Sequence, residues 1–368
     1  MYLPFTAPES IVGALANACA DYQGARWLLC VADRHAQELP ALLDALRAKG
    51  LRACGGLFPG LIHGATRHDE GIVAIGLPRA SQVCRVDLGA RDGRWVDPPP
   101  ELPPGGPASL TVLVDSQAPG IAGLLEDLYD RFADRVHHVG GGAGRHDLQP
   151  LPSIFTEDGL LERGGLVVHV PMASTVTVRH GWRRVRGPFV ATRTRGNVIQ
   201  ELNWEPAGSF YRAQVESLAP QMTGRPVFPD LASWYPLCIG KEGGEDVMRD
   251  PMYINDADEL VVLSDVPENS VMFLAHGDPD SLIESARQAV QECHVVRPAV
   301  YCFVSDCYSR ALMLGERFPL ELAAVSEALA RFTPLHAEGV LALGEIATNG
   351  GRNLEFFNKT IVVAIGHE

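Results

Sequence analysis

The stretch PAVYCFVSDCYSRALMLGER, from Pro298 to Arg317, decides the fold expected for this chain. Its AVYCFV run is apolar, β-branched and aromatic, which is typical of a buried strand. Ser305 and Asp306 both favour a helix N-cap, so a helix is expected to follow. Cys307 then lies in the first helical turn, where free N–H groups and the helix dipole favour thiolates and anions, and Arg310 lies on the same face. Two interpretations stay open: a buried structural cysteine beside a surface arginine, or a thiolate and anion-binding site.

Composition restricts the class of protein. The 368 residues suffice for two domains, and 46% hydrophobic with 21% charged residues is ordinary for a globular protein. A formal charge of −14 argues against binding to nucleic acid or to an anionic membrane surface. The sequence shows no run of 18 apolar residues, no secretory signal and no C-x-x-C among its eight cysteines. We therefore expect a cytoplasmic protein with reduced thiols.

The order of predicted elements suggests two domains. A strand at residues 26–32, an amphipathic helix at 37–49 and a strand at 71–77 indicate an α/β layer with β-α-β crossovers. Strand-rich sequence replaces this alternation later, and we place the boundary near Arg195, which gives domains 1–195 and 196–368. The expected fold class is α/β and α+β, with mixed sheets flanked by helices.

Three similar strand and glycine patterns indicate an internal repeat. ACGGLFPG is followed by GIVAIGL, VGGGAG by GLVVHV, and LALGEI by TIVVAIG. Each glycine cluster predicts either an ordinary tight turn or a place where a ligand approaches the backbone closely. Because there are three, we expect duplicated strand–Gly turn–strand units around a central cleft, with Gly141 and Gly142 contacting a ligand.

Common catalytic and nucleotide-binding motifs are missing from the sequence. Arg145 stands where a dinucleotide fingerprint needs its third glycine, and DLQPLP cannot continue as a helix. There is no P-loop, H-E-x-x-H or G-x-S-x-G. Cys307 could act as a nucleophile only with a histidine nearby in space, and the sequence does not choose among twelve. A cysteine-dependent enzyme is therefore the least favoured alternative.

Several motifs together resemble FIST-domain proteins over about residues 25–366. The C-x-x-R and LGER segments, GVLALGEIATNG (339–350) and FFNKTIVVAIG (356–366) are similar to motifs of the family's C-terminal domain. ACGGLFPG and GGGAG resemble turns of its N-terminal domain. Gly55 and Gly56 replace polar turn residues of the family, and Arg145 replaces an aspartate, so hydrogen bonding there is expected to differ.

The resemblance implies a bacterial sensory module that binds a small molecule and signals through a separate partner such as a histidine kinase. The ligand class proposed for the family is amino acids or similar metabolites, and some members resemble haem-based nitric oxide sensors. In this chain several polar residues match the family's motifs and could bind a ligand. For Glu345 and Asn358 the alternative is that their side chains only stabilise turns through hydrogen bonds to the backbone. The candidate ligand-binding residues are Cys307, Arg310, Glu316, Glu345, Asn349, Asn358 and Thr360, with Gly141 and Gly142.

For haem b, the first candidate axial ligand is His180 in VRHGWRRV, because Trp182 and three arginines surround it in sequence. Covalent attachment is excluded, since C-x-x-C-H is missing. A histidine that is merely hydrogen-bonded at a strand end is the alternative. His276 and His294 are the second choices. Whether the chain forms a homo-oligomer stays open.

Overall fold

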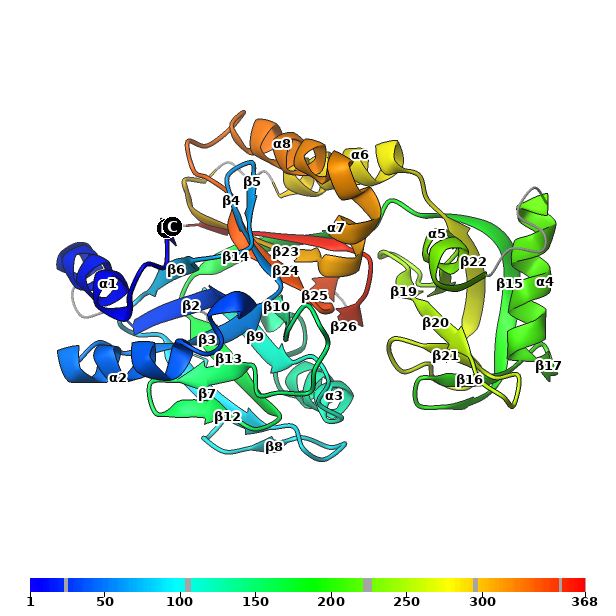
Figure 1. Ribbon diagram of the computed structural model, residues 1–368, viewed down its shortest axis with the longest axis horizontal. Coiled ribbons are helices and arrows are strands. Elements are labelled where there is room, and N and C mark those ends of the chain that lie inside the picture. Colours follow the sequence, from blue (N-terminus) through cyan, green and yellow to red (C-terminus); the bar gives the residue numbers. More distant parts are fainter. Residues whose placement is uncertain (23–25, 103–106, 221–226, 294–296, 351–352, 368) are drawn as a thin grey trace. The chain divides into compact units, whose positions relative to one another are not determined.

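The computed structural model describes residues 1–22, 26–102, 107–220, 227–293, 297–350 and 353–367 (Figure 1). The chain forms two compact units. Unit 1 comprises Met1–Arg179, Ala286–Phe356 and Ile361–Glu368, and unit 2 comprises His180–Ser285 and Phe357–Thr360. This division follows contacts in space, whereas the boundary near Arg195 divides the chain along the sequence. That boundary stays a prediction.

Unit 1 contains three copies of one arrangement, which confirms the internal repeat. In each copy a central strand is followed by a helical crossover to a parallel strand, then by a hairpin, then by a strand that returns antiparallel to the central one. The first copy contains β1 (Tyr2–Leu3), α1 (Pro8–Tyr22), β2 (Arg26–Ala32), η1 (Asp33–His35), α2 (Leu39–Lys49), β3 (Ala53–Phe58), β4 (Gly60–His63), β5 (Thr66–His68) and β6 (Ile72–Leu77).

The second and third copies follow the same plan. The second contains β7 (Gln82–Asp87), β8 (Arg94–Trp95), β9 (Ser109–Asp115), α3 (Ile121–Phe132), η2 (Ala133–Arg135), β10 (His137–Ala143), β11 (Ile154–Thr156), β12 (Gly159–Leu161) and β13 (Gly164–Val170). The third contains β14 (Ala173–Arg179), α6 (Pro279–Glu292), β23 (Ala299–Cys307), α7 (Tyr308–Leu314), η5 (Gly315–Arg317), α8 (Phe318–Leu329), β24 (Glu338–Ala342), β25 (Glu345–Asn349), β26 (Asn353–Phe357) and β27 (Ile361–His367).

The three sheets exchange their hairpins in a cycle. The strand orders are β1-β6-β2-β3-β11-β12, β26-β25-β10-β9-β13-β7-β8 and β14-β27-β23-β24-β4-β5. Thus the hairpin β4–β5 of the first copy completes the third sheet, β11–β12 of the second completes the first sheet, and β25–β26 of the third completes the second. Every sheet therefore contains strands from two copies.

In the first two patterns Gly55, Gly56 and the glycines at 140–142 lie inside strands and not in turns, which corrects the sequence prediction. In the third pattern, LALGEI, Gly344 lies between β24 and β25 with φ of 103°, as a turn requires. Gly55, Gly140 and Gly339 stand opposite Leu29, Val112 and Val304 in the parallel pairs. At each of the three, a Cβ would collide with the carbonyl oxygen of the residue opposite. Glycine is required because the parallel backbones approach more closely than any side chain allows.

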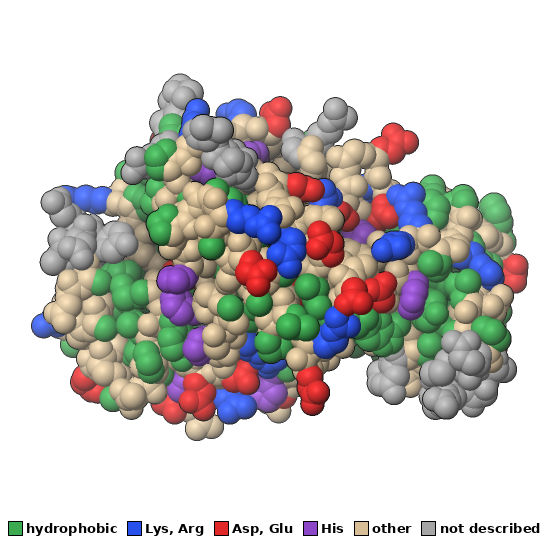
Figure 2. Space-filling view, turned by 90° about the horizontal axis from the view of Figure 1, so that it is seen from above, with side chains coloured by type: hydrophobic (Ala, Val, Ile, Leu, Met, Phe, Trp, Pro, Cys, Tyr) green, Lys and Arg blue, Asp and Glu red, His purple; other side chains and the backbone are tan. Residues whose placement is uncertain are grey.

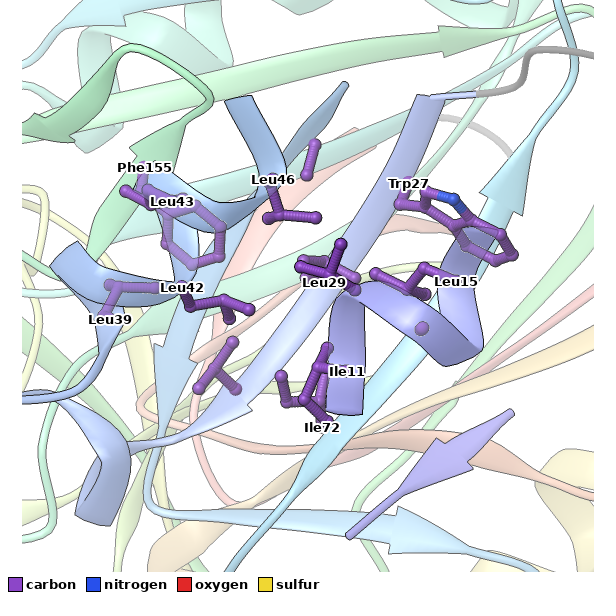
Figure 3. Close-up of a cluster of buried hydrophobic side chains, with 14 of the residues drawn as sticks. Ile11, Leu15, Trp27, Leu29, Leu39, Leu42, Leu43, Leu46, Ile72 and Phe155 are labelled. Carbon is purple, nitrogen blue, oxygen red and sulfur yellow. The ribbon is translucent and has the colours of Figure 1, made fainter. Parts of the chain in front are cut away.

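Helices cover the outer faces of the first two sheets. Figure 3 shows Ile11 and Leu15 of α1 and Leu42 and Leu46 of α2 directed toward Leu29 of β2, in one buried cluster. Gly50, with φ of 72°, ends α2 as predicted. In the second sheet Leu124, Leu125 and Leu128 of α3 pack in a cluster with Val112 and Val167.

Unit 2 is strand-rich, as predicted for the middle of the chain. Its sheet has the order β19-β18-β22-β15-β16-β21-β20, with β17 beside β16. The elements are β15 (Arg183–Arg195), β16 (Val198–Leu202), β17 (Glu205–Pro206), α4 (Ala207–Leu218), the π-helical segment η4 (Val227–Leu231), α5 (Ala232–Trp234), β18 (Leu237–Ile239), β19 (Val247–Arg249), β20 (Pro251–Ile254), β21 (Leu260–Val262) and β22 (Val271–His276).

Candidate ligand-binding site

Cys307 ends a strand and does not lie in the first helical turn. β23 continues through Ser305 and Asp306, so Cys307 is the N-cap of α7. That helix has seven residues. The thiol is 3% exposed, and its Sγ lies 3.2 Å from the Oγ of Ser309. Burial to this degree favours the structural cysteine of the first interpretation, and a role of Cys307 in ligand binding stays a prediction.

Arg310 is fully buried, which makes the prediction of a surface arginine wrong. Its guanidinium donates to Glu321 of α8, with Nη2 2.7 Å from Oε2 and Nε 3.0 Å from Oε1. Asp306 lies beside it, with Oδ1 3.8 Å from Nε. A bidentate carboxylate partner already neutralises this cation. An anionic ligand at Arg310 would have to displace Glu321.

The sequence did not predict Asp306 and Glu321 as the charged partners of Arg310. Both are fully buried, like Glu345, so three carboxyl groups share the surroundings of one guanidinium. Burial is the main cause that raises the pKa of Asp306 well above its usual range; Glu321 and Glu345 add to the shift and Arg310 opposes it. Among the described residues, no donor lies within hydrogen-bond distance of either Asp306 carboxyl oxygen. The buried surroundings therefore favour the protonated form of Asp306, and this charge cluster is a buried internal network.

The remaining predicted polar residues are distributed over both units. Glu316 is exposed, and Asn349 is buried in β25. Asn358 and Thr360 are buried residues of the loop that belongs to unit 2, where Asn358 Oδ1 accepts a hydrogen bond from Ser264 Oγ at 3.0 Å. Ligand binding by these residues stays a prediction.

Lys359, between Asn358 and Thr360, was missed. It is fully buried, its Nζ lies 3.0 Å from Oδ2 of Asp250, and it stands 5.5 Å from the centre of the Trp182 ring. All of these groups belong to unit 2. The motif FFNKT therefore fixes a loop through a buried ion pair and a cation–π contact.

Gly141 and Gly142 contact other parts of unit 1. A Cβ on Gly141 would lie 2.8 Å from Ser305 Oγ and 2.9 Å from Ala342 Cβ, and one on Gly142 would lie 2.5 Å from the carbonyl oxygen of Leu343. Gly142 also donates its N–H to the carbonyl of Gly344 at 2.7 Å. The third copy of the repeat thus supplies the close approach that the sequence analysis assigned to a ligand.

His180 does not fit the role of a haem ligand. Its Nδ1 accepts a hydrogen bond from the N–H of Trp182 at 2.9 Å, and its Nε2 lies 2.8 Å from Oε2 of Glu245. Both ring nitrogens are occupied in this arrangement. His276 directs Nδ1 to the carbonyl of Trp234 at 3.1 Å, and His294 lies outside the described residues. No group of three His, Cys, Asp or Glu that could hold a metal occurs in the described part of the chain.

Replacing His180 by alanine is accordingly expected to leave hemin binding unchanged. Absorption spectra during a hemin titration would be compared between the wild type, His180→Ala and His276→Ala. A Soret band that saturates at one haem per chain in the wild type and disappears only in His180→Ala would contradict this expectation.

A cavity of about 510 Å³ in unit 1 is a candidate ligand site. Equivalent positions of the three central strands contribute Leu28, Thr111 and Phe303 to its wall. The returning strands add Leu77 and Val170. Such a volume and an apolar lining are typical of sites for small organic ligands. The sequence alone does not reveal this cavity, because its wall comes from segments far apart in the chain.

One carboxylate faces this apolar cavity. Glu338, the first residue of β24, is paired with Phe303 across the parallel strands, and its side chain is 23% exposed. Its Oε1 lies 2.6 Å from the backbone nitrogen of Met1 and 3.6 Å from Nδ1 of His63. His336 also lines the cavity, and its ring centre is 5.6 Å from that of His63. We call this space the Glu338 cavity.

Two observations concern the surface charge and the hydrophobicity of the helices. On the face seen in Figure 2, acidic and basic side chains are interspersed and form no broad basic area. Within the described ranges, no helix is long and apolar enough to cross a membrane.

Comparison with protein families identifies two adjacent domains. The FIST N domain matches residues 26–205, and the FIST C domain matches residues 209–348. No curated protein sequence matches the chain. The two matches together include all three central strands and the Glu338 cavity wall that they form.

Proposed function

Because the chain belongs to the FIST-domain proteins, we propose that it is a sensory protein whose small-molecule ligand occupies the Glu338 cavity. FIST domains are associated with sensory signal transduction and small-ligand binding and not with catalysis. The observation that supports this choice of site is an apolar cavity of about 510 Å³ with one carboxylate in its wall. An apolar cavity with few polar groups is the usual form of a small-molecule site.

The buried charge cluster at Arg310 supports a ligand site less well. Asp306, Arg310 and Glu321 are fully buried and interact with one another, so their charges are satisfied without a ligand. A ligand there would have to enter a packed interior and replace an existing ion pair, which costs several kcal/mol. The Glu338 cavity needs no such rearrangement.

The proposed signal passes to a separate protein such as a histidine kinase, and the proposed ligand is a metabolite that binds without haem. A haem-based nitric oxide sensor is the second candidate. It would need His276, whose Nδ1 faces the Trp234 carbonyl and so directs the lone pair of Nε2 away, as metal-binding histidines commonly do.

Filling the cavity is expected to abolish ligand binding. Met172 is half-buried in the cavity wall, so Met172→Trp places an indole ring into the space without disturbing a sheet. A metabolite library would be screened by thermal shift, where a ligand at a hundred times its Kd stabilises the wild type by about 2.7 kcal/mol. We expect that stabilisation to be lost in Met172→Trp.

Met252→Trp is the matched control, since Met252 is exposed in unit 2 and does not line the cavity. Its response to the ligand should equal that of the wild type. A ligand that stabilises Met172→Trp as strongly as Met252→Trp would place the binding site elsewhere.

A further inference from the structure

We infer that Thr111 is a ligand-binding residue of the Glu338 cavity, and that the ligand carries an oxygen that accepts a hydrogen bond from its hydroxyl. This inference rests on the proposed function, because it names one contact and the chemistry of the ligand at the same site. It is supported by the position of Thr111 in the repeat, by the burial of its hydroxyl and by the partners of the other polar groups in the wall.

Thr111 lies on the inner face of the second sheet. Side chains alternate between the two faces of a strand, and its neighbours Leu110 and Val112 belong to the buried cluster that contains the leucines of α3. Thr111 is therefore directed to the opposite face, where it lines the cavity. Its strand, β9, is hydrogen-bonded to β10 on one side and to β13 on the other, so the backbone holds this side chain in place.

The repeat indicates that an apolar residue is sufficient for packing at this position. Leu28 and Phe303 occupy it in the first and third copies, each one residue before the position that pairs with the repeated glycine. Valine is similar to threonine in shape and is also favoured in strands. Packing and strand preference therefore do not explain the hydroxyl of Thr111.

The hydroxyl of Thr111 is buried without a partner in the protein. The residue is 8% exposed, and none of the hydrogen bonds made by the described residues includes its side chain. Burying a hydroxyl that makes no hydrogen bond costs free energy, whereas an oxygen of a ligand in the cavity would satisfy it. Orphaned donors are rarer in protein interiors than under-used acceptors, which favours an acceptor on the ligand.

Three other polar side chains of the wall already have a partner or contact water. Glu338 Oε1 lies 2.6 Å from the backbone nitrogen of Met1, and Tyr301 has the hydroxyl of Ser109 as a hydrogen-bond partner. His336 is exposed, so water solvates its ring. A ligand can therefore satisfy Thr111 without displacing a protein group from its partner.

Two aryl probes of similar shape isolate the contribution of the ligand oxygen. The probe 4-fluoroacetophenone carries a carbonyl oxygen where 4-fluoro-α-methylstyrene carries a methylene group, and fluorine NMR measures the dissociation constant of each. Titrations of the full chain would compare the wild type, Thr111→Val, Thr111→Ser and Met172→Trp. Thr194→Val is the matched control, because Thr194 lies in β15 of unit 2 and does not line the cavity.

We expect Thr111→Val to weaken the binding of 4-fluoroacetophenone about 3- to 10-fold, the range for one neutral hydrogen bond, and to change that of 4-fluoro-α-methylstyrene less than about twofold. Thr111→Ser keeps the hydroxyl and should stay closer to the wild type. Without ligand, the melting temperature of Thr111→Val should equal or exceed that of the wild type, because no hydrogen bond within the protein is lost. Thr194→Val should bind both probes like the wild type.

The outcomes separate this inference from the proposed function. If Met172→Trp abolishes the binding of both probes but Thr111→Val binds 4-fluoroacetophenone as tightly as the wild type, the contact is overturned and the cavity remains a ligand site. A lower melting temperature of Thr111→Val overturns it too, since the hydroxyl would then have a structural role. No binding of 4-fluoroacetophenone to the wild type overturns it as well. If Met172→Trp changes the binding of neither probe and of no compound in the metabolite library, the proposed site itself fails.

Discussion

Replacing Arg310 by alanine is expected to lower the free energy of unfolding by about 3–5 kcal/mol, the range for breaking a buried ion pair. The guanidinium is fully buried between Glu321 and Asp306. Its removal leaves the Glu321 carboxylate without a cation in a medium that solvates it poorly. Urea unfolding of wild type and variant, followed by circular dichroism, measures the difference.

Two further variants separate the charge from the lost packing. Arg310→Met with Glu321→Met replaces the pair by apolar groups of similar size and should recover most of the loss seen in Arg310→Met alone. Arg331→Ala removes an exposed arginine just after α8 and should cost less than about 0.5 kcal/mol. A loss below about 1 kcal/mol in Arg310→Ala would mean that the ion pair does not stabilise unit 1.

The pH dependence of the same variants follows from the carboxyl groups. The pKa of Asp306 is raised in the folded protein, so its protonated form favours folding below that raised value, and this contribution is lost as the pH rises through it. Without Arg310 this pKa should rise further, because the opposing cation is gone. The destabilisation by Arg310→Ala should therefore be smaller at pH 5 than at pH 8. A loss that is equal at both values would contradict the role of the carboxyl groups.

Replacing Lys359 by methionine is expected to destabilise unit 2 by about 3–5 kcal/mol, again because one partner of a buried pair is removed. The Asp250 carboxylate loses its ammonium partner at 3.0 Å, and Trp182 loses a cation–π contact. Methionine keeps the length of the side chain, so the change isolates the charge. Hydrogen exchange measured by mass spectrometry should show faster exchange in β19 and β20, the strands on either side of Asp250.

Controls for Lys359 use the other partner and a surface lysine. Asp250→Asn together with Lys359→Met should cost less than Lys359→Met alone, since no unpaired charge remains. Lys49→Met changes an exposed lysine at the end of α2 and should leave exchange in unit 2 unchanged. Unchanged exchange in Lys359→Met would show that the pair contributes nothing to this unit.

The sequence predicted the helices and strands better than the structural role of the glycines within them. The alternation of apolar runs and helices identified β2, α2 and β23, and the three glycine patterns identified the repeat. It misread Gly55 and Gly140 as turns, because a glycine that admits a close neighbouring strand has the same local signature as one in a turn. Only the register of the parallel pairs distinguishes the two cases.

The candidate sites could not be predicted from the sequence, because they are formed by residues far apart in the chain. Glu321 lies among the buried apolar residues of α8. A carboxylate on the apolar face of a helix is the one sequence feature that could have predicted a buried partner for Arg310. The Glu338 cavity joins Leu28, Thr111 and Phe303 from three copies of the repeat, so it could be found only after the sheets were placed.

The cyclic exchange of hairpins also constrains how the protein is made. β10 finds its antiparallel neighbour β25 about 200 residues later in the chain, and β4 pairs with β24 about 280 residues later. During synthesis the first two copies must therefore present unpaired strand edges until almost the whole chain has left the ribosome. Pairing over such sequence separations slows folding. A chain that ends before residue 345 would have two incomplete sheets, whose open strand edges can pair with other chains.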